Sequence, residues 1–176
     1  MPVTGVQSIL PKGKTVGVEE FVARYGGVYE HSPWVAAEAA LFIGDDADHE
    51  TLAILMAECV DNASQARRLE LIRAHPDLAG KASIAGELTA ESTAEQSSAG
   101  LDRCSPEEYE RFQSLNAAYK DKFGFPFVMA VRNSPRVDIL DAFERRLENA
   151  YDEEFETAIA EIHKIARLRI DAMETG

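Results

Sequence analysis

The stretch SPEEYERFQSLNAAYKDKFG, residues 105–124, carries the signals that decide the fold class. Ser105 is a candidate N-cap, Pro106 stands at the first helical position, and Gly124 is typical of the residue that follows a helix C-terminus. Between these ends, apolar side chains recur every three or four residues, at Tyr109, Phe112, Leu115, Tyr119 and Phe123. This spacing predicts an amphipathic helix with one buried face.

Helical patterns of this kind cover most of the chain. One runs from Val18 to the pair of glycines at 26–27, and another begins with Ser32 as a candidate N-cap before Pro33. An apolar stripe from Phe155 to Met173 predicts a long last helix. Because no repeat, low-complexity tract or linker interrupts these patterns, we expect a single all-α domain, a helical bundle, over residues 1–176.

The composition argues against several classes of function. The chain has 18 Lys and Arg against 31 Asp and Glu, a net charge of −13, which disfavours a nucleic acid or an anionic membrane as partner. The N-terminal residues lack a signal-peptide pattern and no apolar run is long enough to span a bilayer, so we expect a cytoplasmic protein. Cys59 and Cys104 form no CxxC pair, and we interpret them as reduced thiols.

The four histidines do not predict a metal site. His31, His49 and His163 stand far apart and form no HxxxH or HxH pair. The fourth, His75, lies in ELIRAHPDLAGKA, residues 70–82, where Pro76 ends a helical pattern. We therefore expect His75 to point sideways from a helix end into a pocket.

Two further stretches depart from the amphipathic pattern. FGFPFVMAV, residues 123–131, predicts a short extended segment near residues 125–131. This segment is either a buried connector or a surface whose free backbone groups bind a polar ring. In TAESTAEQSSAG, residues 89–100, Ser92, Glu95 and Gln96 share one helix face, which is either solvated or a ligand contact.

Three strings, in this order and at these spacings, resemble the 2-oxo-4-hydroxy-4-carboxy-5-ureidoimidazoline (OHCU) decarboxylase family: LIRAHPDLAGKA, LTAESTAEQSSAGLD and LNAAYKDKFGFPFVMAVR. The resemblance runs from about Val18 to Asp171 and leaves residues 1–17 as a peripheral N-terminal extension. It implies an all-helical homodimer with no metal and no organic cofactor. It also implies a small-molecule ureidoimidazoline substrate and an activity in urate degradation.

The resemblance also implies roles for single residues. His75 corresponds to the family's proposed general acid or base. The residues that match substrate contacts are Pro76, Ser92, Glu95, Gln96, Phe127, Val128, Met129, Ala130 and Val131. Arg132 is a further candidate, either as an anchor for the substrate carboxylate or as part of a structural ion pair.

The implied chemistry explains why no cofactor is expected. The substrate carboxylate lies on a carbon that also bears a hydroxyl, next to a ring C=N bond that accepts the electron pair when CO₂ leaves. The protein then has to position the substrate, desolvate its carboxylate and deliver one proton to one face, which would give (S)-allantoin. An imidazole that titrates near neutrality suits this step. A binding module without chemistry, and a cofactor-free hydrolase or isomerase of a related ureide, stay open as alternatives.

Overall fold

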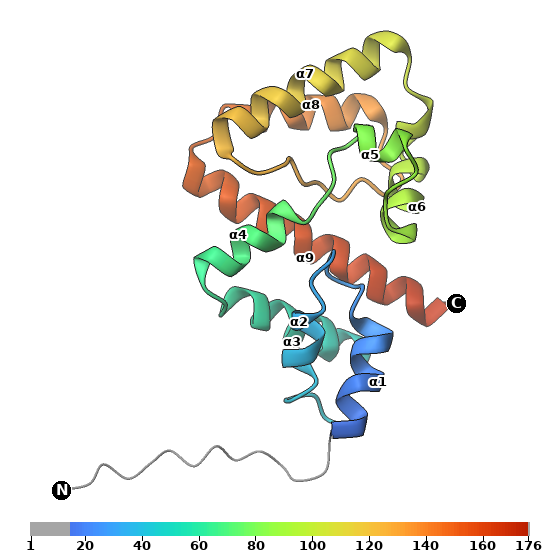
Figure 1. Ribbon diagram of the computed structural model, residues 1–176, viewed down its shortest axis with the longest axis vertical. Helices are drawn as coiled ribbons and strands as arrows, with labels where there is room; N and C mark the ends of the chain where they lie inside the picture. The colour runs from blue at the N-terminus through green and yellow to red at the C-terminus, as the bar shows by residue number, and fades with distance from the viewer. Residues whose placement is uncertain (1–14, 176) are drawn as a thin grey trace, which may run out of the picture.

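The computed structural model describes residues 15–175, and these residues form helices and connecting segments without a strand (Figure 1). The predicted all-α domain is confirmed. The helices are α1 (Thr15–Tyr25), α2 (Trp34–Ala39), α3 (His49–Asp61), α4 (Gln65–Arg73), α5 (Lys81–Ile84), α6 (Ala90–Ser98), the 3₁₀ turn η1 (Leu101–Arg103), α7 (Pro106–Phe123), α8 (Arg136–Leu147) and α9 (Tyr151–Thr175). Most of the predicted N-terminal extension, residues 1–14, lies outside the described residues; α1 begins inside its last three positions.

Local capping sets where the helices begin. At the start of α7, the Ser105 hydroxyl accepts the Glu108 N–H at 3.1 Å, and the Glu108 carboxylate accepts the Ser105 N–H at 3.0 Å. Gly124 ends α7 with a φ of 74°. The prediction for Ser32 is wrong: Pro33 is the N-cap of α2, because the Ser32 hydroxyl donates to the Glu30 carbonyl inside the preceding turn.

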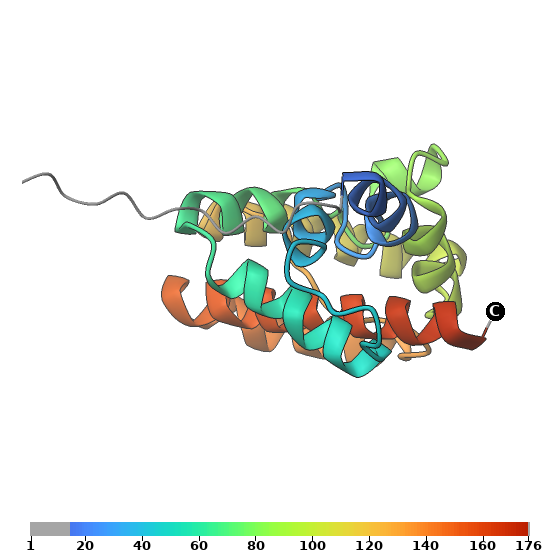
Figure 2. The same ribbon diagram turned by 90° about the horizontal axis from the view of Figure 1, so that it is seen from below.

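The helices pack in two layers with α9 as the longest element. Figure 2 shows α3, α8 and α9 along one side and α1, α4, α6 and α7 along the other. The apolar stripe of α9 is buried in this chain's own core, through Phe155, Ala158, Ile159, Ile162, Ile165, Ala166 and Ile170. The stripe therefore stabilises the monomer fold and is not a free surface for a second copy.

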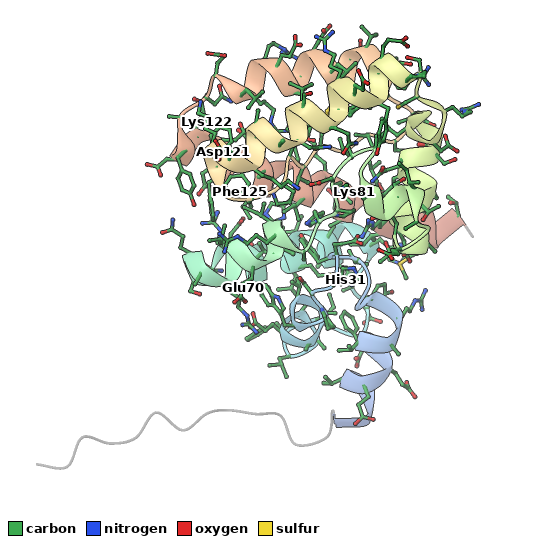
Figure 3. All side chains as sticks on the ribbon, turned by 45° about the horizontal axis from the view of Figure 1, so that its top comes forward. His31, Glu70, Lys81, Asp121, Lys122 and Phe125 are labelled. Atoms are coloured by element: carbon green, nitrogen blue, oxygen red, sulfur yellow. The ribbon has the colours of Figure 1, made fainter. Side chains whose placement is uncertain are left out.

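The segment after α7, predicted to be extended, belongs to no helix, and long-range contacts hold it. Phe125 lies between α7 and α9, against Tyr119 and Phe155 (Figure 3). The rings of Phe127 and Phe143 are stacked at 3.8 Å between centroids. These aromatic contacts fix the direction of the chain through residues 125–131.

Side chains from α8 and α9 also form hydrogen bonds with two backbone groups of this segment. Arg146 donates to the Val128 carbonyl at 2.7 Å, and its guanidinium lies 4.2 Å from the centre of the Phe127 ring. Glu161 accepts the Ala130 N–H at 2.9 Å. These two backbone groups are thus bonded to the protein and are not free for a ligand.

Candidate active site

His75 lies at the point where α4 ends, and its tautomer follows from its partner. The Nδ1 atom lies 2.9 Å from the Leu71 carbonyl oxygen. Because a carbonyl only accepts, Nδ1 carries the hydrogen, and Nε2 keeps a lone pair. His75 is one of the residues that line a pocket.

The protonation of His75 differs from the expectation of an imidazole that titrates near neutrality. Burial lowers the pKa of His75 from 6.5 to about 4, although the Leu71 carbonyl and the charge of Glu30 act in the opposite direction. The residue is 8% exposed. His75 is therefore neutral near pH 7, and its Nε2 can take up a proton before it delivers one.

The loop after His75 is held by amide side chains from two helices. On α6, the Gln96 side chain accepts the Ala79 N–H at 3.1 Å and donates to the Asp77 carbonyl at 3.3 Å. On α7, Asn116 donates to the Leu78 carbonyl at 2.9 Å. Ala79 has a φ of 50°, a left-handed conformation that costs an alanine about 1 kcal/mol or more. The amide groups thus stabilise a strained loop that orients His75.

These elements surround a narrow pocket that is partly open to solvent. Its walls come from the end of α4, from α6, from the segment after α7 and from α9. The lining residues are His75, Pro76, Leu78, Ser92, Glu95, Gln96, Phe127, Val128, Met129, Val131, Ile165 and Arg169. The three stretches singled out in the sequence, residues 70–82, 89–100 and 123–131, thus meet at one pocket. His75 and the polar face of α6 line the same cavity.

Two of the candidate residues lie outside this lining. Ala130 has its N–H on Glu161. Arg132 donates to the Leu168 carbonyl at 3.3 Å and lies 3.9 Å from Glu95. It lines a larger cavity that shares Arg169 with the pocket.

Arg169 on α9 is the cation of the pocket, and its N–H groups are occupied. It meets Glu95 through Nε at 2.8 Å and Nη2 at 3.1 Å, and it forms an ion pair with Glu30 through Nη2 at 2.8 Å. Its Nη1 donates to the carbonyls of Gly27 at 3.3 Å and Val28 at 3.5 Å. Since a guanidinium has five N–H donors, these contacts leave none free for a substrate.

Burial and neighbouring charges have opposing effects on the pKa values of Glu30 and Arg169. Burial alone would raise the pKa of Glu30, but Arg169 and Thr89 hold the pKa of that carboxyl below its ordinary value. Burial alone would lower the pKa of Arg169, but Glu95 and Glu30 raise it above its ordinary value. The guanidinium and the Glu30 carboxylate therefore both stay charged at neutral pH.

Sequence reasoning missed Glu30 and Arg169. Arg169 had a detectable signal, because it falls between Ala166 and Ile170 on the apolar face of the last helix, where a charged residue is unexpected. Glu30 lies in a connection without periodicity, and nothing in its sequence neighbourhood marks it as buried.

A family model described as OHCU decarboxylase matches residues 14–171. The chain belongs to the OHCU decarboxylase family. An OHCU decarboxylase from Halalkalicoccus jeotgali is 46% identical over 158 residues, which make up 88% of this chain and 85% of that protein. Another from Haloferax volcanii is 45% identical over 152 residues, 86% of this chain and 88% of that protein.

A solved structure is similar to this chain over most of its length. A crystal structure of (S)-allantoin synthase superposes with a TM-score of 0.67 at 34% identity, over 88% of this chain and half of that chain's length. Within residues 15–175, no group of three His, Cys, Asp or Glu side chains is arranged to hold a metal ion. In the same residues, no helix is long and apolar enough to cross a membrane.

Proposed function

We propose that this chain catalyses the cofactor-free decarboxylation of OHCU to (S)-allantoin in urate degradation, with His75 in proton transfer. Membership in the OHCU decarboxylase family supports the reaction. The observation that carries the role of His75 is its neutral imidazole, with a protonated Nδ1 fixed on the Leu71 carbonyl, in the lining of the pocket.

A neutral imidazole fits the proton balance of this reaction. When the C–C bond to the carboxylate breaks, CO₂ leaves and the electron pair moves into the ring C=N bond, whose nitrogen takes a proton. The product of this step is an enol at the carbon that carried the carboxylate. The enol becomes allantoin when its hydroxyl loses a proton and the ureido-bearing carbon gains one. Water can supply the proton that the ring nitrogen takes. Nε2 of His75 can take the enol hydroxyl proton and return it to one face of the ureido-bearing carbon, so His75 ends the cycle unchanged.

The charge distribution of the pocket favours loss of the carboxylate. Arg169 already binds Glu30 and Glu95, so it offers a substrate carboxylate no free N–H. The carboxylate would instead meet apolar walls such as Phe127 and Ile165. An unpaired, desolvated carboxylate is less stable than a transition state whose charge has spread into the ring, and this difference lowers the barrier.

Pro76, Ser92, Glu95, Gln96 and the segment from Phe127 to Val131 are the proposed substrate contacts. Glu95 is the charged side chain with the best placement to receive ureido or ring N–H groups, because it belongs to the lining and Arg169 fixes its orientation. Gln96 acts through the loop that it holds, since its amide is already bonded to Asp77 and Ala79.

We also propose that the chain works as a cytoplasmic homodimer. The resemblance to the family supports the dimer, and so do large apolar side chains that this chain leaves exposed in the α2–α3 region, with Phe42 at 72%. Leu41 and Ile54 are exposed in the same region. These side chains, unlike the buried stripe of α9, form an apolar surface that is available to a second copy.

The decisive experiment supplies freshly prepared OHCU and follows the product by circular dichroism against spontaneous decay. We expect one enantiomer of allantoin from the wild type. The change His75→Asn should lower the rate by about 10²–10⁴-fold, the usual contribution of general acid–base catalysis. His49→Asn is the matched control, because His49 begins α3 and pairs with Glu174 away from the pocket.

The outcomes separate the remaining alternatives. A His75→Asn protein that makes one enantiomer at near wild-type rate would falsify the assignment of His75. Binding of allantoin without any acceleration of OHCU decay would favour a binding module. Release of a product other than allantoin and CO₂ would favour a hydrolase or isomerase.

A further inference from the structure

Glu30 is a buried carboxylate directly behind the wall of the pocket. It lies in the connection between α1 and α2, is 2% exposed and does not belong to the pocket lining. Its oxygens meet Arg169 Nη2 at 2.8 Å, the Thr89 hydroxyl at 2.9 Å and the Ser92 hydroxyl at 3.1 Å. Glu30 therefore joins α6 and α9, the two helices that present Ser92, Glu95 and Arg169 to the pocket.

The connection that carries Glu30 is itself fixed on both sides. Before Glu30, the Tyr29 hydroxyl donates to His163 Nδ1 at 2.9 Å, and after it the Ser32 hydroxyl donates to the Glu30 carbonyl at 2.9 Å. Figure 1 shows this connection reaching the middle of α9, and Figure 3 places His31, the next residue, near the centre of the molecule. The carboxylate is thus held by its backbone as well as by its partners.

Stability alone does not explain why a carboxylate occupies this position. Removal of a carboxylate from water costs several kcal/mol, and well-packed apolar residues often replace a buried ion pair without loss of stability. What a carboxylate does here, and an apolar residue could not, is to bind two side chains of the pocket wall. Ser92 donates to it, and Arg169 divides its N–H groups between Glu30 and Glu95.

We propose that Glu30 is a positioning residue for the decarboxylation, which holds Ser92 and, through Arg169, Glu95 in place on the pocket wall. The expected effect on the rate rests on the proposed function. The way in which Glu30 acts is inferred from its contacts alone. Without the Glu30 charge, Arg169 has Glu95 as its remaining carboxylate, and the Ser92 hydroxyl loses a charged acceptor. Arg169, which also donates to the Ser92 hydroxyl at 3.3 Å, is then no longer held from the side of Glu30, so that Glu95 and Ser92 can shift together with it.

The expected effect falls on the chemical step more than on binding. A displacement of about 1 Å at a positioning group can cost about 10²-fold in rate. The apolar walls of the pocket, which Glu30 does not touch, still bind the substrate. We therefore expect Glu30→Gln to lower kcat by about 10- to 100-fold and to change KM by less than about threefold.

The test compares Glu30→Gln with Glu108→Gln. Glu108 also pairs with an arginine, Arg136, at 2.8 Å, but this pair lies outside the pocket, and glutamine preserves the capping box. We expect Glu108→Gln to keep the wild-type kcat. The proposal is overturned if Glu30→Gln keeps wild-type kcat and KM, or if both variants lose the same activity. If Glu30→Gln does not fold, Glu30→Asp decides by the same criteria, because it keeps the charge but shortens the reach.

A second comparison separates positioning from a general loss of stability. If Glu30 acts through Arg169 on Glu95, Glu30→Gln should lower kcat by a smaller factor in a Glu95→Gln background than in the wild type. Fully additive losses in kcat would contradict this. A readout independent of activity is the NMR signal of the Arg169 Nε–H, which is bonded to Glu95 at 2.8 Å.

That signal should be protected from exchange in the wild type and should lose protection in Glu30→Gln. Protection that stays unchanged would overturn the inference even if the protein were inactive on OHCU. An inactive wild type would instead contradict the proposed function.

Discussion

The neutral state of His75 should appear as a dependence of stability on pH. Burial lowers the pKa of its imidazole to about 4, whereas the unfolded chain has the ordinary value of 6.5. As pH falls below 6.5, the unfolded chain takes up a proton at residue 75 that the native protein does not bind. The free energy of unfolding therefore falls between pH 6.5 and about 4, and this contribution is fully present only above pH 6.5.

The size of the effect follows from the two pKa values. Between about pH 7.5 and about pH 5, the contribution of His75 to the free energy of unfolding should fall by about 2 kcal/mol. The variant His75→Asn has no proton to bind at this position. Its stability should therefore fall by about 2 kcal/mol less than that of the wild type over the same interval.

Urea unfolding at the two pH values, followed by circular dichroism, measures the change in the free energy of unfolding for each protein. The test compares this change between His75→Asn and the wild type. A constant cost of the lost bond to Leu71 cancels, because it is present at both pH values. His31→Asn is the control: the His31 side chain is 64% exposed, and its φ of 46° suits asparagine. The reasoning is refuted if His75→Asn loses as much stability as the wild type between the two pH values.

Three further outcomes are expected. Ser105→Ala should lower the free energy of unfolding by about 1 kcal/mol, because the hydroxyl caps α7; unchanged stability in urea unfolding would contradict the role of the cap. Exhaustive chelation and dialysis should leave the rate of OHCU decay catalysed by the protein unchanged, since the ring C=N bond serves as electron acceptor. A loss of this rate that zinc or magnesium restores would contradict a cofactor-free reaction. Light scattering should give a mass near twice 19.4 kDa, and Phe42→Ser should reduce it, because Phe42 is the most exposed of the large apolar side chains; a wild-type monomer at micromolar concentration would rule out the dimer.

The helices were predictable because their signals act over a few residues. The N-cap Ser105, the proline after it and Gly124 determine the ends of α7 through contacts within one turn. Ser64 and Thr89 cap α4 and α6 in the same way. Ser32 has the same pattern, yet its hydroxyl bonds to the Glu30 carbonyl, so α2 begins later.

The candidate site was predictable only in part. The residues around His75, Glu95 and Phe127 could be found from the motifs, and the structure brings these three stretches to one pocket. That pocket geometry does not test their roles, which stay predictions. The pKa of His75 could not be read from the sequence, because it depends on how much of the imidazole neighbouring segments cover.

By itself, the sequence determined the all-α fold class, the ends of α7 and the family, since caps, periodicity and motifs are local patterns. Tertiary structure alone decided which charges meet. Arg169 binds backbone carbonyls 142 and 141 residues away and joins Glu95 to Glu30. Likewise, Arg146 and Glu161 take up backbone groups of the extended segment. Such pairings depend on the packing of α9 against the rest of the chain, because a buried ion is stable only where folding brings a partner to it.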